Sequence, residues 1–424
     1  MTAALLALNA RTFASLKRHR NYRLFFTGQV ISVSGTWMQN VALAWLVVEL
    51  TSSPLAVGLL AFCRFIPFTV FGLFAGVVAD RIDNRKLVIA TQSVSMIFSA
   101  LFAVLVLGGL ETLWVVYLLA ILSSTALVFD APGRHALTFQ MVGRDELPNA
   151  VALNASLFNA SRVVGPAMAG VLIAAFGVGV CFAINTVTFL AVLAGLLMMR
   201  REELVPLEPS GEPPTLMKGI GEGFAWVRRS PDARLVLAIV TVVSTVGFNF
   251  HVILPLLASD TLNTGPEVFG ILSACFGGGA LVGALLSAAL GRASWKVLVF
   301  GTGGFSVCLL ALAPLATVWL CAILLVFTGV CFTLWTSNAS SILQLRAPDH
   351  LRGRVVSLYL WAFAGLAPLG GLLAGWLCAI GGTQLSFAVA GSTGLLMAAL
   401  ASRELNQRRV AAVLHAPNVE GTTR

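Results

Sequence analysis

Hydrophobic positions along the chain form long runs, separated by short segments where turn residues and charges gather. The runs are about 20 residues long, the length that an α-helix needs to cross a bilayer. They lack the strict alternation of lipid-facing strands, so the pattern predicts helices and not a barrel. Twelve membrane-spanning helices are expected near residues 22–48, 54–79, 86–108, 112–132, 149–176, 180–200, 234–259, 266–290, 295–315, 317–338, 352–379 and 383–402.

The composition agrees with an all-α integral membrane protein. Of the 424 residues, 58% are hydrophobic and only 11% are charged, and the mean hydropathy is +0.91. Soluble domains carry ~25% charged residues, so these values exclude a soluble enzyme, a disordered protein and a disulfide scaffold. The seven cysteines lie scattered in apolar runs without a metal-ligand spacing. They are interpreted as small buried residues, and neither a metal nor a cofactor is expected.

The positive charges predict the orientation of the chain. Twelve spans bring both termini to one side, and 25 of the 27 Lys and Arg residues fall on that side. The loops on the opposite side carry only the acidic residues Glu49, Glu111, Asp260 and Glu267. The positive-inside rule therefore predicts cytoplasmic termini in a plasma (inner) membrane. The net charge of +9 then indicates topology and contact with anionic lipids, and not nucleic-acid binding.

A proline- and glutamate-rich polar segment, residues 201–233, separates the sixth and seventh predicted spans. It predicts a flexible linker between an N-terminal six-helix bundle (1–200) and a C-terminal six-helix bundle with a tail (234–424). A shift of 204 residues reveals a faint repeat, aligning Gln140 with Gln344, Asp145 with Asp349, Leu147 with Leu351, Val151 with Val355, Ala160 with Ala364 and Gly177 with Gly381. Two linked six-helix bundles are typical of alternating-access transporters.

The end of the linker predicts a short amphipathic helix. Leu216, Ile220, Phe224 and Val227 fall on one helical face, and charged residues occupy the others. A helix of this kind lies on the inner leaflet of a membrane. A calmodulin-type target helix would show a similar pattern, but the leaflet interpretation needs no further partner.

The inner end of the second span reads Gly76-Val-Val-Ala-Asp80-Arg81-Ile-Asp83-Asn84-Arg85-Lys86. This resembles the loop motif of the major facilitator superfamily. The resemblance implies that the aspartate latches the two halves together against the amino-terminal end of span eleven. The predicted latch residues are Gly76, Asp80, Arg81, Arg85 and Arg134. The alternative is an ordinary charged loop. In the corresponding place the second half reads Gly283-x-x-x-Ser287 and Gly291-Arg292, without an aspartate.

The fifth span carries a second resemblance. Ala152, Ser161, Gly165, Pro166, Ala169 and Gly170 have the spacing of the antiporter motif found in exporting branches of the superfamily. Ser161, Gly165, Pro166 and Gly170 are the predicted helix bend, because proline removes a hydrogen bond and small residues permit tight contact. A generic packing kink is the alternative. The segments Arg64–Pro67, Ala150–Asn154 and Trp226–Pro231 resemble the branch of macrolide efflux proteins and the enterobactin exporter.

Two arginines are predicted near the bilayer midplane. Arg64 lies about eleven residues into the second span and Arg162 about thirteen residues into the fifth. Charges inside a membrane are costly, and no carboxylate lies at that depth in the sequence. An anionic or strongly hydrogen-bonding cargo would satisfy both arginines. Backbone carbonyls or nearby amides are an equal alternative.

The other candidates are polar, titratable or aromatic residues of the spans. Candidates for the substrate cavity are Gln39, Asn40, Arg64, Asn159, Arg162, His251, Trp335, Asn338 and Trp361. Asp130 and His251 are the candidates for proton coupling. Asp130 stands four residues before Arg134, so a structural ion pair is the preferred interpretation. A hydrogen-bonded structural histidine is likewise preferred for His251, and an interfacial anchor for the tryptophans.

The sequence therefore predicts a monomeric secondary transporter that exports an amphiphilic small molecule, such as a drug, secondary metabolite or siderophore. The chain has no P-loop, so a proton gradient is the expected energy source. One alternative is a transporter of anionic lipids or solutes in the uptake direction. A different class, an integral-membrane enzyme, would need a cluster of catalytic residues, whereas the five histidines are dispersed. A scaffold would have no need of midplane arginines.

Overall fold

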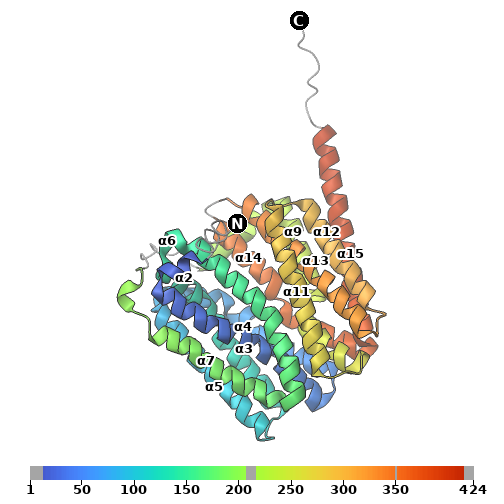
Figure 1. The fold of residues 1–424 in the computed structure, drawn as a ribbon. Coiled ribbons are helices and arrows are strands. Elements are labelled where there is room, and N and C mark those ends of the chain that lie inside the picture. The colour runs from blue at the N-terminus through green and yellow to red at the C-terminus, as the bar shows by residue number, and fades with distance from the viewer. Residues whose placement is uncertain (1–12, 207–215, 349–350, 415–424) are drawn as a thin grey trace, which may run out of the picture.

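The computed structural model describes residues 13–206, 216–348 and 351–414, and it is built of helices (Figure 1). The first-half helices are α2 (Ala14–Arg18), α3 (Arg20–Thr51), α4 (Pro54–Arg81), α5 (Asn84–Leu107), α6 (Leu113–Phe176), α7 (Val178–Leu197) and the 3-10 turn η1 (Arg201–Glu203). The second-half helices are α8 (Leu216–Arg229), α9 (Pro231–Gly247), α10 (Phe250–Leu256), the π-turn η2 (Leu257–Thr261), α11 (Pro266–Leu290), α12 (Trp295–Leu312), α13 (Val318–Arg346), α14 (Arg352–Ala364) and α15 (Ala367–Leu414). The described residues contain no strand, which confirms the all-α class.

Within the described ranges, ten helical segments are long and apolar enough to cross a membrane. The prediction of twelve differs because two of these segments each contain more than one predicted span. Helix α6 continues through residues 133–148, with a change of direction at Gly143, where φ is 69°. Helix α15 likewise runs through non-helical backbone at Gly381 and Gly382. The helical membrane fold is confirmed, and the count of twelve stays a prediction.

Small residues allow helices of the same half to approach each other closely. A Cβ added at Gly195 in α7 would lie 2.7 Å from the carbonyl oxygen of Leu24 in α3. Within a bilayer, helices associate through such packing because lipid offers no hydrophobic driving force between them. In the second half, aromatic rings fill the interior. They are Phe248, Phe250, Phe276, Phe305, Phe332, Trp335, Tyr359 and Phe363.

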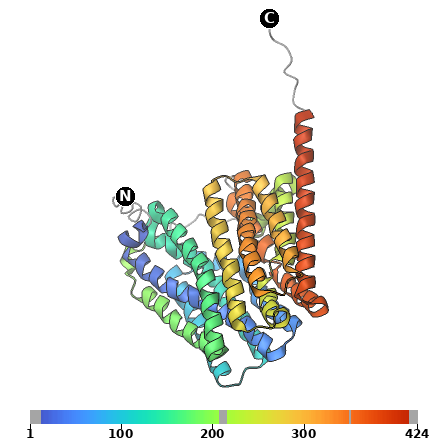
Figure 2. The ribbon, with the colours of Figure 1, turned by 45° about the vertical axis from the view of Figure 1, so that its right-hand side comes forward.

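The two halves meet along two helix pairs, α4 with α15 and α6 with α11. A Cβ added at Gly270 of α11 would lie 2.6 Å from the carbonyl oxygen of Pro166 and 2.8 Å from the Cα of Gly170. A Cβ added at Gly58 of α4 would lie 2.8 Å from the carbonyl oxygen of Gly371. The contact between Gly58 and Gly371 lies at the end of α4 that is away from Arg81. Figure 2 shows α6 and α11 close together at their lower ends and farther apart above.

The opposite end of the halves is open. A Cβ added at Gly72 or Gly76 in α4 would meet no atom within 4 Å. The last turns of α11 are exposed on several faces, with Leu285 at 64%, Leu286 at 46% and Leu290 at 53% exposure. The structure is therefore packed shut at one end and open at the end that carries Arg81.

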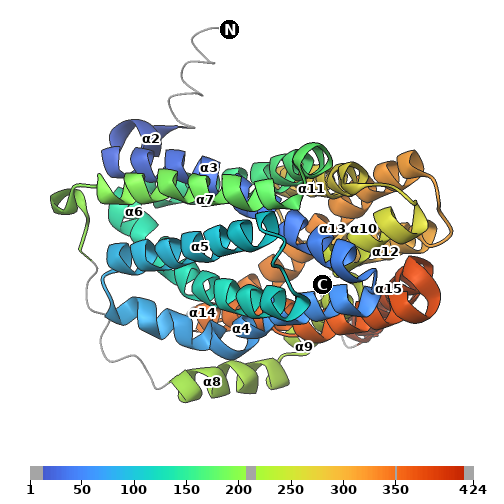
Figure 3. The same cartoon turned by 90° about the horizontal axis from the view of Figure 1, so that it is seen from below.

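The predicted amphipathic helix of the linker is formed as α8, which lies beside α9 and α14 (Figure 3). The Glu222 carboxylate pairs with the Arg354 guanidinium of α14. A Cβ added at Gly223 would lie 3.1 Å from the Leu358 side chain. Val227 is buried while Phe224 is exposed. The side chains of Leu216 and Ile220 lie outside the described residues. Helix α8 therefore packs partly against the end of α14.

Candidate functional site

Arg64 lies on α4 where the two halves meet. Its Nη2 donates a hydrogen bond to Asn40 Oδ1 of α3, at 2.7 Å. The neighbouring Phe65 ring contacts the His251 ring of α10, with 5.0 Å between centroids. Within the described residues no carboxylate pairs with Arg64. Its charge is thus held by a neutral amide at the junction of α3, α4 and α10.

Arg162 on α6 is held by aromatic rings. Its Cζ lies 5.2 Å from the ring centroid of Trp37 and 5.9 Å from that of Phe158. The two rings pack edge to face at 5.4 Å. A guanidinium within about 6 Å of a ring face is attracted by the ring quadrupole. The stem of Arg162 also packs against Gly277 of α11, where an added Cβ would lie 3.1 Å from Arg162 Cγ.

Arg64 and Arg162 contact residues on the same face of α3. Trp37 and Asn40 stand three residues apart in one helix, and residues at this spacing are neighbours on the helix surface. Neither Arg64 nor Arg162 forms an ion pair with another described residue. Each of these two half-buried cations therefore contacts α3 without a counter-ion among the described residues. Such a site favours an anion or a strong hydrogen-bond acceptor.

Other cavity candidates bond within their own half. Gln39 Oε1 accepts hydrogen bonds from Ser99 at 2.8 Å and from Asn185 at 2.5 Å. Asn159 Nδ2 donates to the Ala155 carbonyl of its own helix, at 2.9 Å. Gln39 thus bonds two neighbouring helices and Asn159 its own helix, so less of their bonding capacity remains for a cargo.

In the second half, Trp335 is fully buried among the aromatic rings, and its Nε1 has no partner among the described residues. Asn338 Oδ1 accepts from the Ser294 amide at 2.9 Å, which ties α13 to the start of α12. Trp361 of α14 keeps 38% exposure. Of these three candidates, Trp361 is exposed, Asn338 is buried at the edge of a pocket near the end of α11, and Trp335 is fully buried.

His251 lies close to the arginine site. It faces Phe65 across the junction between the halves, and its Nε2 is buried without a partner among the described residues. The hydrogen-bonded structural role preferred from the sequence therefore has no visible acceptor or donor at Nε2. Burial and the neighbouring Arg64 guanidinium both disfavour a positive charge on this imidazole, so proton uptake at Nε2 requires water to reach the site.

Asp130 is buried and accepts hydrogen bonds from several donors of the first half. Thr91 donates to Oδ1 at 2.7 Å and Gln92 at 2.9 Å. Arg134 Nε donates to Oδ2 at 2.9 Å, and Arg134 also pairs with Gln29. The intrahelical pair that the spacing permits is formed. Donors from α5 and α6 thus occupy both oxygen atoms of this carboxylate.

The residues of the proposed latch have different surroundings. Arg85 is buried and donates to the carbonyls of Leu196 at 2.8 Å and Leu197 at 3.2 Å, at the C-terminal end of α7. A cation at this end of a helix complements its unpaired carbonyls. Arg81 is exposed. The side chain of Asp80 lies outside the described residues. Arg85 thus contacts its own half.

The predicted bend residues of α6 separate onto two faces. Ser161 Oγ lies 3.0 Å from Ser34 Oγ of α3. A Cβ added at Gly165 would lie 2.9 Å from the Ser34 carbonyl oxygen. Pro166 and Gly170 instead face Gly270 of α11. The small residues therefore let one helix pack tightly against both halves at once.

Sequence reasoning missed the aromatic partners of Arg162. Phe158 could have been found, because its spacing of four residues from Arg162 places both on one helix face. Trp37 lies more than 100 residues away, and nothing in the local pattern connects it to Arg162. The residues Thr91, Gln92 and Gln29 around Asp130 were missed for the same reason.

Known transporters resemble this chain over most of its length. A family model described as transmembrane secretion effector matches residues 10–420. The staphyloferrin A transporter of Staphylococcus aureus is 24% identical over 376 residues, 87% of this chain and 92% of that protein. Macrolide efflux protein A of Streptococcus pyogenes is 22% identical over 351 residues, 81% of this chain and 86% of that protein.

Solved structures agree with this assignment at the level of the fold. The crystal structure of the nucleoside transporter NupG superposes with a TM-score of 0.68 at 13% identity, over 91% of this chain and 98% of that chain. The resemblance to the branch of macrolide efflux proteins, expected from the motifs, is confirmed. The chain belongs to the transmembrane secretion effector family of the major facilitator superfamily, and it is a multi-pass membrane transporter and not an enzyme.

Proposed function

We propose that this transporter exports an amphiphilic small molecule that carries an anionic or strongly hydrogen-bonding group. The observation that carries the proposal is the pair Arg64 and Arg162, which have no acidic partner among the described residues. An anionic group that reaches either guanidinium would form charge-assisted hydrogen bonds with it. The relatives that are named for staphyloferrin A and macrolide efflux support a drug or siderophore as the class of cargo.

The proposed mechanism is alternating access between two bundles, residues 1–200 and 234–424, joined by the linker 201–233. Tight packing of Gly58 and Gly270 at one end, and open space at Gly72 and Gly76 at the other, supports this mechanism. We assign the open end to the cytoplasm, since the basic loops and both termini belong to it. In the opposite state Asp80 would latch α4 to the amino-terminal end of α14.

Protons are the proposed coupling ion. His251 is the stronger candidate, since its unpartnered Nε2 lies beside the arginine site. Asp130 is the weaker candidate, because Thr91, Gln92 and Arg134 already satisfy it. A proton on His251 would add a third positive charge next to Arg64. Export driven by an inward proton gradient requires antiport, so the proton and the cargo would occupy the site in alternate steps of the cycle.

Flux in inverted membrane vesicles tests the proposed function. Vesicles from an efflux-deficient strain expose the cytoplasmic face, so an exporter accumulates cargo inside them when a proton gradient is applied. A panel of anionic, neutral and cationic compounds should show accumulation, strongest for the anionic members. Accumulation only in right-side-out vesicles would instead identify an uptake transporter. Flux that is insensitive to a protonophore would exclude proton coupling.

Gly270→Ala is expected to open the packed end of the two halves. The added Cβ would meet backbone atoms of Pro166 and Gly170 within 3.0 Å, and overpacking of this kind costs about 1–3 kcal/mol. Spin labels at the exposed positions Leu55 and Ile271 should report a larger separation, together with a slower transport rate. Gly278→Ala on the same helix is the matched control, because its Cβ would meet nothing within 4 Å. An unchanged label distance in both variants would contradict tight packing as the closing device.

A further inference from the structure

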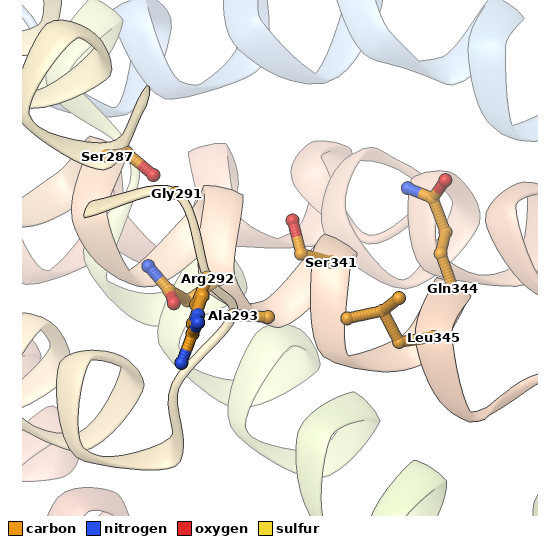
Figure 4. Close-up of a pocket in the computed structure, with 8 residues that line it drawn as sticks. Ser287, Gly291, Arg292, Ala293, Ser341, Gln344 and Leu345 are labelled. Carbon is orange, nitrogen blue, oxygen red and sulfur yellow. The ribbon is translucent and has the colours of Figure 1, made fainter. Parts of the chain in front are cut away.

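A polar pocket of about 310 Å³ lies where the chain passes from α11 to α12, at the open end of the second half (Figure 4). The residues that line it are Ser287, Gly291, Arg292, Ala293, Asn338, Ser341, Gln344 and Leu345. Figure 4 shows the residues from Ser287 to Ala293 on one wall and those from Ser341 to Leu345 on the facing wall. The pocket is thus built between the end of α11 and the last turns of α13.

Hydrogen bonds that do not involve Arg292 fix the walls of this pocket. Ser287 Oγ lies 2.7 Å from Ser337 Oγ, which joins α11 to α13. The Ser294 amide donates to Asn338 Oδ1 at 2.9 Å, which joins the following loop to α13. Between these two bonds, Gly291 adopts a φ of +61°, a conformation that glycine reaches at little cost. The turn places Arg292 at the pocket.

The pocket offers hydrogen-bond donors without a carboxylate. Arg292 and Ser341 are exposed at this pocket, and in the part of the chain that the structure describes neither side chain has a hydrogen-bond or ion-pair partner. Gln344 Nε2 donates to Ser340 Oγ at 3.0 Å. None of the residues that line the pocket is acidic. A guanidinium with neutral polar neighbours and no counter-ion favours an anionic ligand.

A second pocket, of about 320 Å³, differs in that a carboxylate is among its lining residues. It lies at the end of the first half and contains Arg18, Arg200 and Glu203. Arg18 pairs with Glu146, and Arg200 pairs with Glu203 at 3.1 Å. Arg20, which also lines this pocket, donates to the Met198 carbonyl at 3.1 Å and has no carboxylate partner among the described residues. Two of the three arginines of this pocket are thus neutralised by carboxylates. Of these two pockets, the one at Arg292 is the one without a carboxylate among its lining residues.

We propose that the Arg292 pocket binds the anionic oxygen atoms of a phosphate or carboxylate group. The planar guanidinium would hold two oxygen atoms, and the Ser341 hydroxyl would donate to a third. The volume suits the head group of a small ligand. Such a group comes either from a phospholipid head group or from a soluble acid. The site is separate from Arg64 and Arg162 and does not depend on the proposed transport function.

Binding to the purified full-length transporter in detergent tests this site. The probes are inorganic phosphate and citrate, measured by equilibrium dialysis, and dioleoylphosphatidylglycerol, measured by native mass spectrometry. Arg292→Gln should weaken binding by about 10-fold or more, the effect of losing one charged hydrogen-bond donor. Ser341→Ala should weaken it by about threefold, and Arg292→Lys should give an intermediate loss because lysine lacks the fork.

The matched control is Arg403→Gln, which removes an exposed cation of the same half outside the pocket. Its affinity for every probe should stay within about twofold of the unmodified transporter. A loss on Arg292→Gln for the lipid alone identifies a head-group site, and a loss for phosphate or citrate identifies a soluble anion. Equal affinities in the Arg292 and Arg403 variants, or no anion binding by the unmodified transporter, would overturn the proposal.

Discussion

Arg64→Gln and Arg162→Gln are each expected to lower the transport of anionic cargo by about 10- to 100-fold. A hydrogen bond to a charged group contributes roughly 1.5–3 kcal/mol, which corresponds to that range. Transport of neutral cargo should fall much less. The measurement is the initial rate of uptake into inverted vesicles, normalised to the amount of folded transporter.

Lysine variants refine this test. Arg162→Lys keeps the positive charge but loses the flat guanidinium that faces Trp37 and Phe158, so only a partial rescue is expected. Trp37→Phe should weaken the cation–π contact with Arg162 while keeping an aromatic ring at this position. Equal losses for anionic and neutral cargo, together with less folded protein, would show that both arginines serve structure alone.

Asp130→Asn is expected to destabilise the transporter by about 3–5 kcal/mol, because removing one member of a buried ion pair leaves the other charge uncompensated. Asp130 is 1% exposed, and the variant leaves Arg134 with neutral amide oxygens, that of Gln29 and that of the new side chain, in place of a carboxylate. Thermal unfolding in detergent, followed by tryptophan fluorescence, should show a clear drop in Tm.

Glu203→Gln is the matched control for this prediction. It breaks the Arg200–Glu203 pair at the surface, where the two side chains are 62% and 40% exposed. Surface pairs contribute ~0–1 kcal/mol, so Tm should hardly change. An Asp130→Asn variant with the Tm of the unmodified transporter but without proton-driven transport would contradict the structural role. It would make Asp130 the proton carrier.

Several features of the site followed from local spacing. Arg134 stands one helical turn from Asp130, and their pair is formed. The alternative that an amide would satisfy a midplane arginine also agrees with the bond from Arg64 to Asn40. The Asp130–Arg134 pair was accessible because a helix fixes the relation of residues three or four positions apart. Asn40 was one of several amides considered, and only the packing of α3 on α4 selects it.

The surroundings of Trp335 and Gln39 show where this reasoning stops. Trp335 lies on α13, which is apolar around its whole circumference, so periodicity does not tell its lipid-facing side from its buried side. The structure buries Trp335 completely. Gln39 was a cavity candidate, but Ser99 and Asn185 on two other helices bind its oxygen. Long-range partners of this kind are set by helix packing.

The sequence by itself determined the class of the protein, because apolar runs long enough to span a bilayer and so few charges leave no soluble alternative. It also singled out Arg64 and Arg162, since a charge inside an apolar run is visible without coordinates. Only the tertiary structure decided that both arginines attach to one face of α3. It also decided which glycines close one end of the halves and that Arg292 stands in a pocket. Those relations join residues far apart in the chain, and in lipid they depend on close packing between helices, which hydrophobicity does not encode.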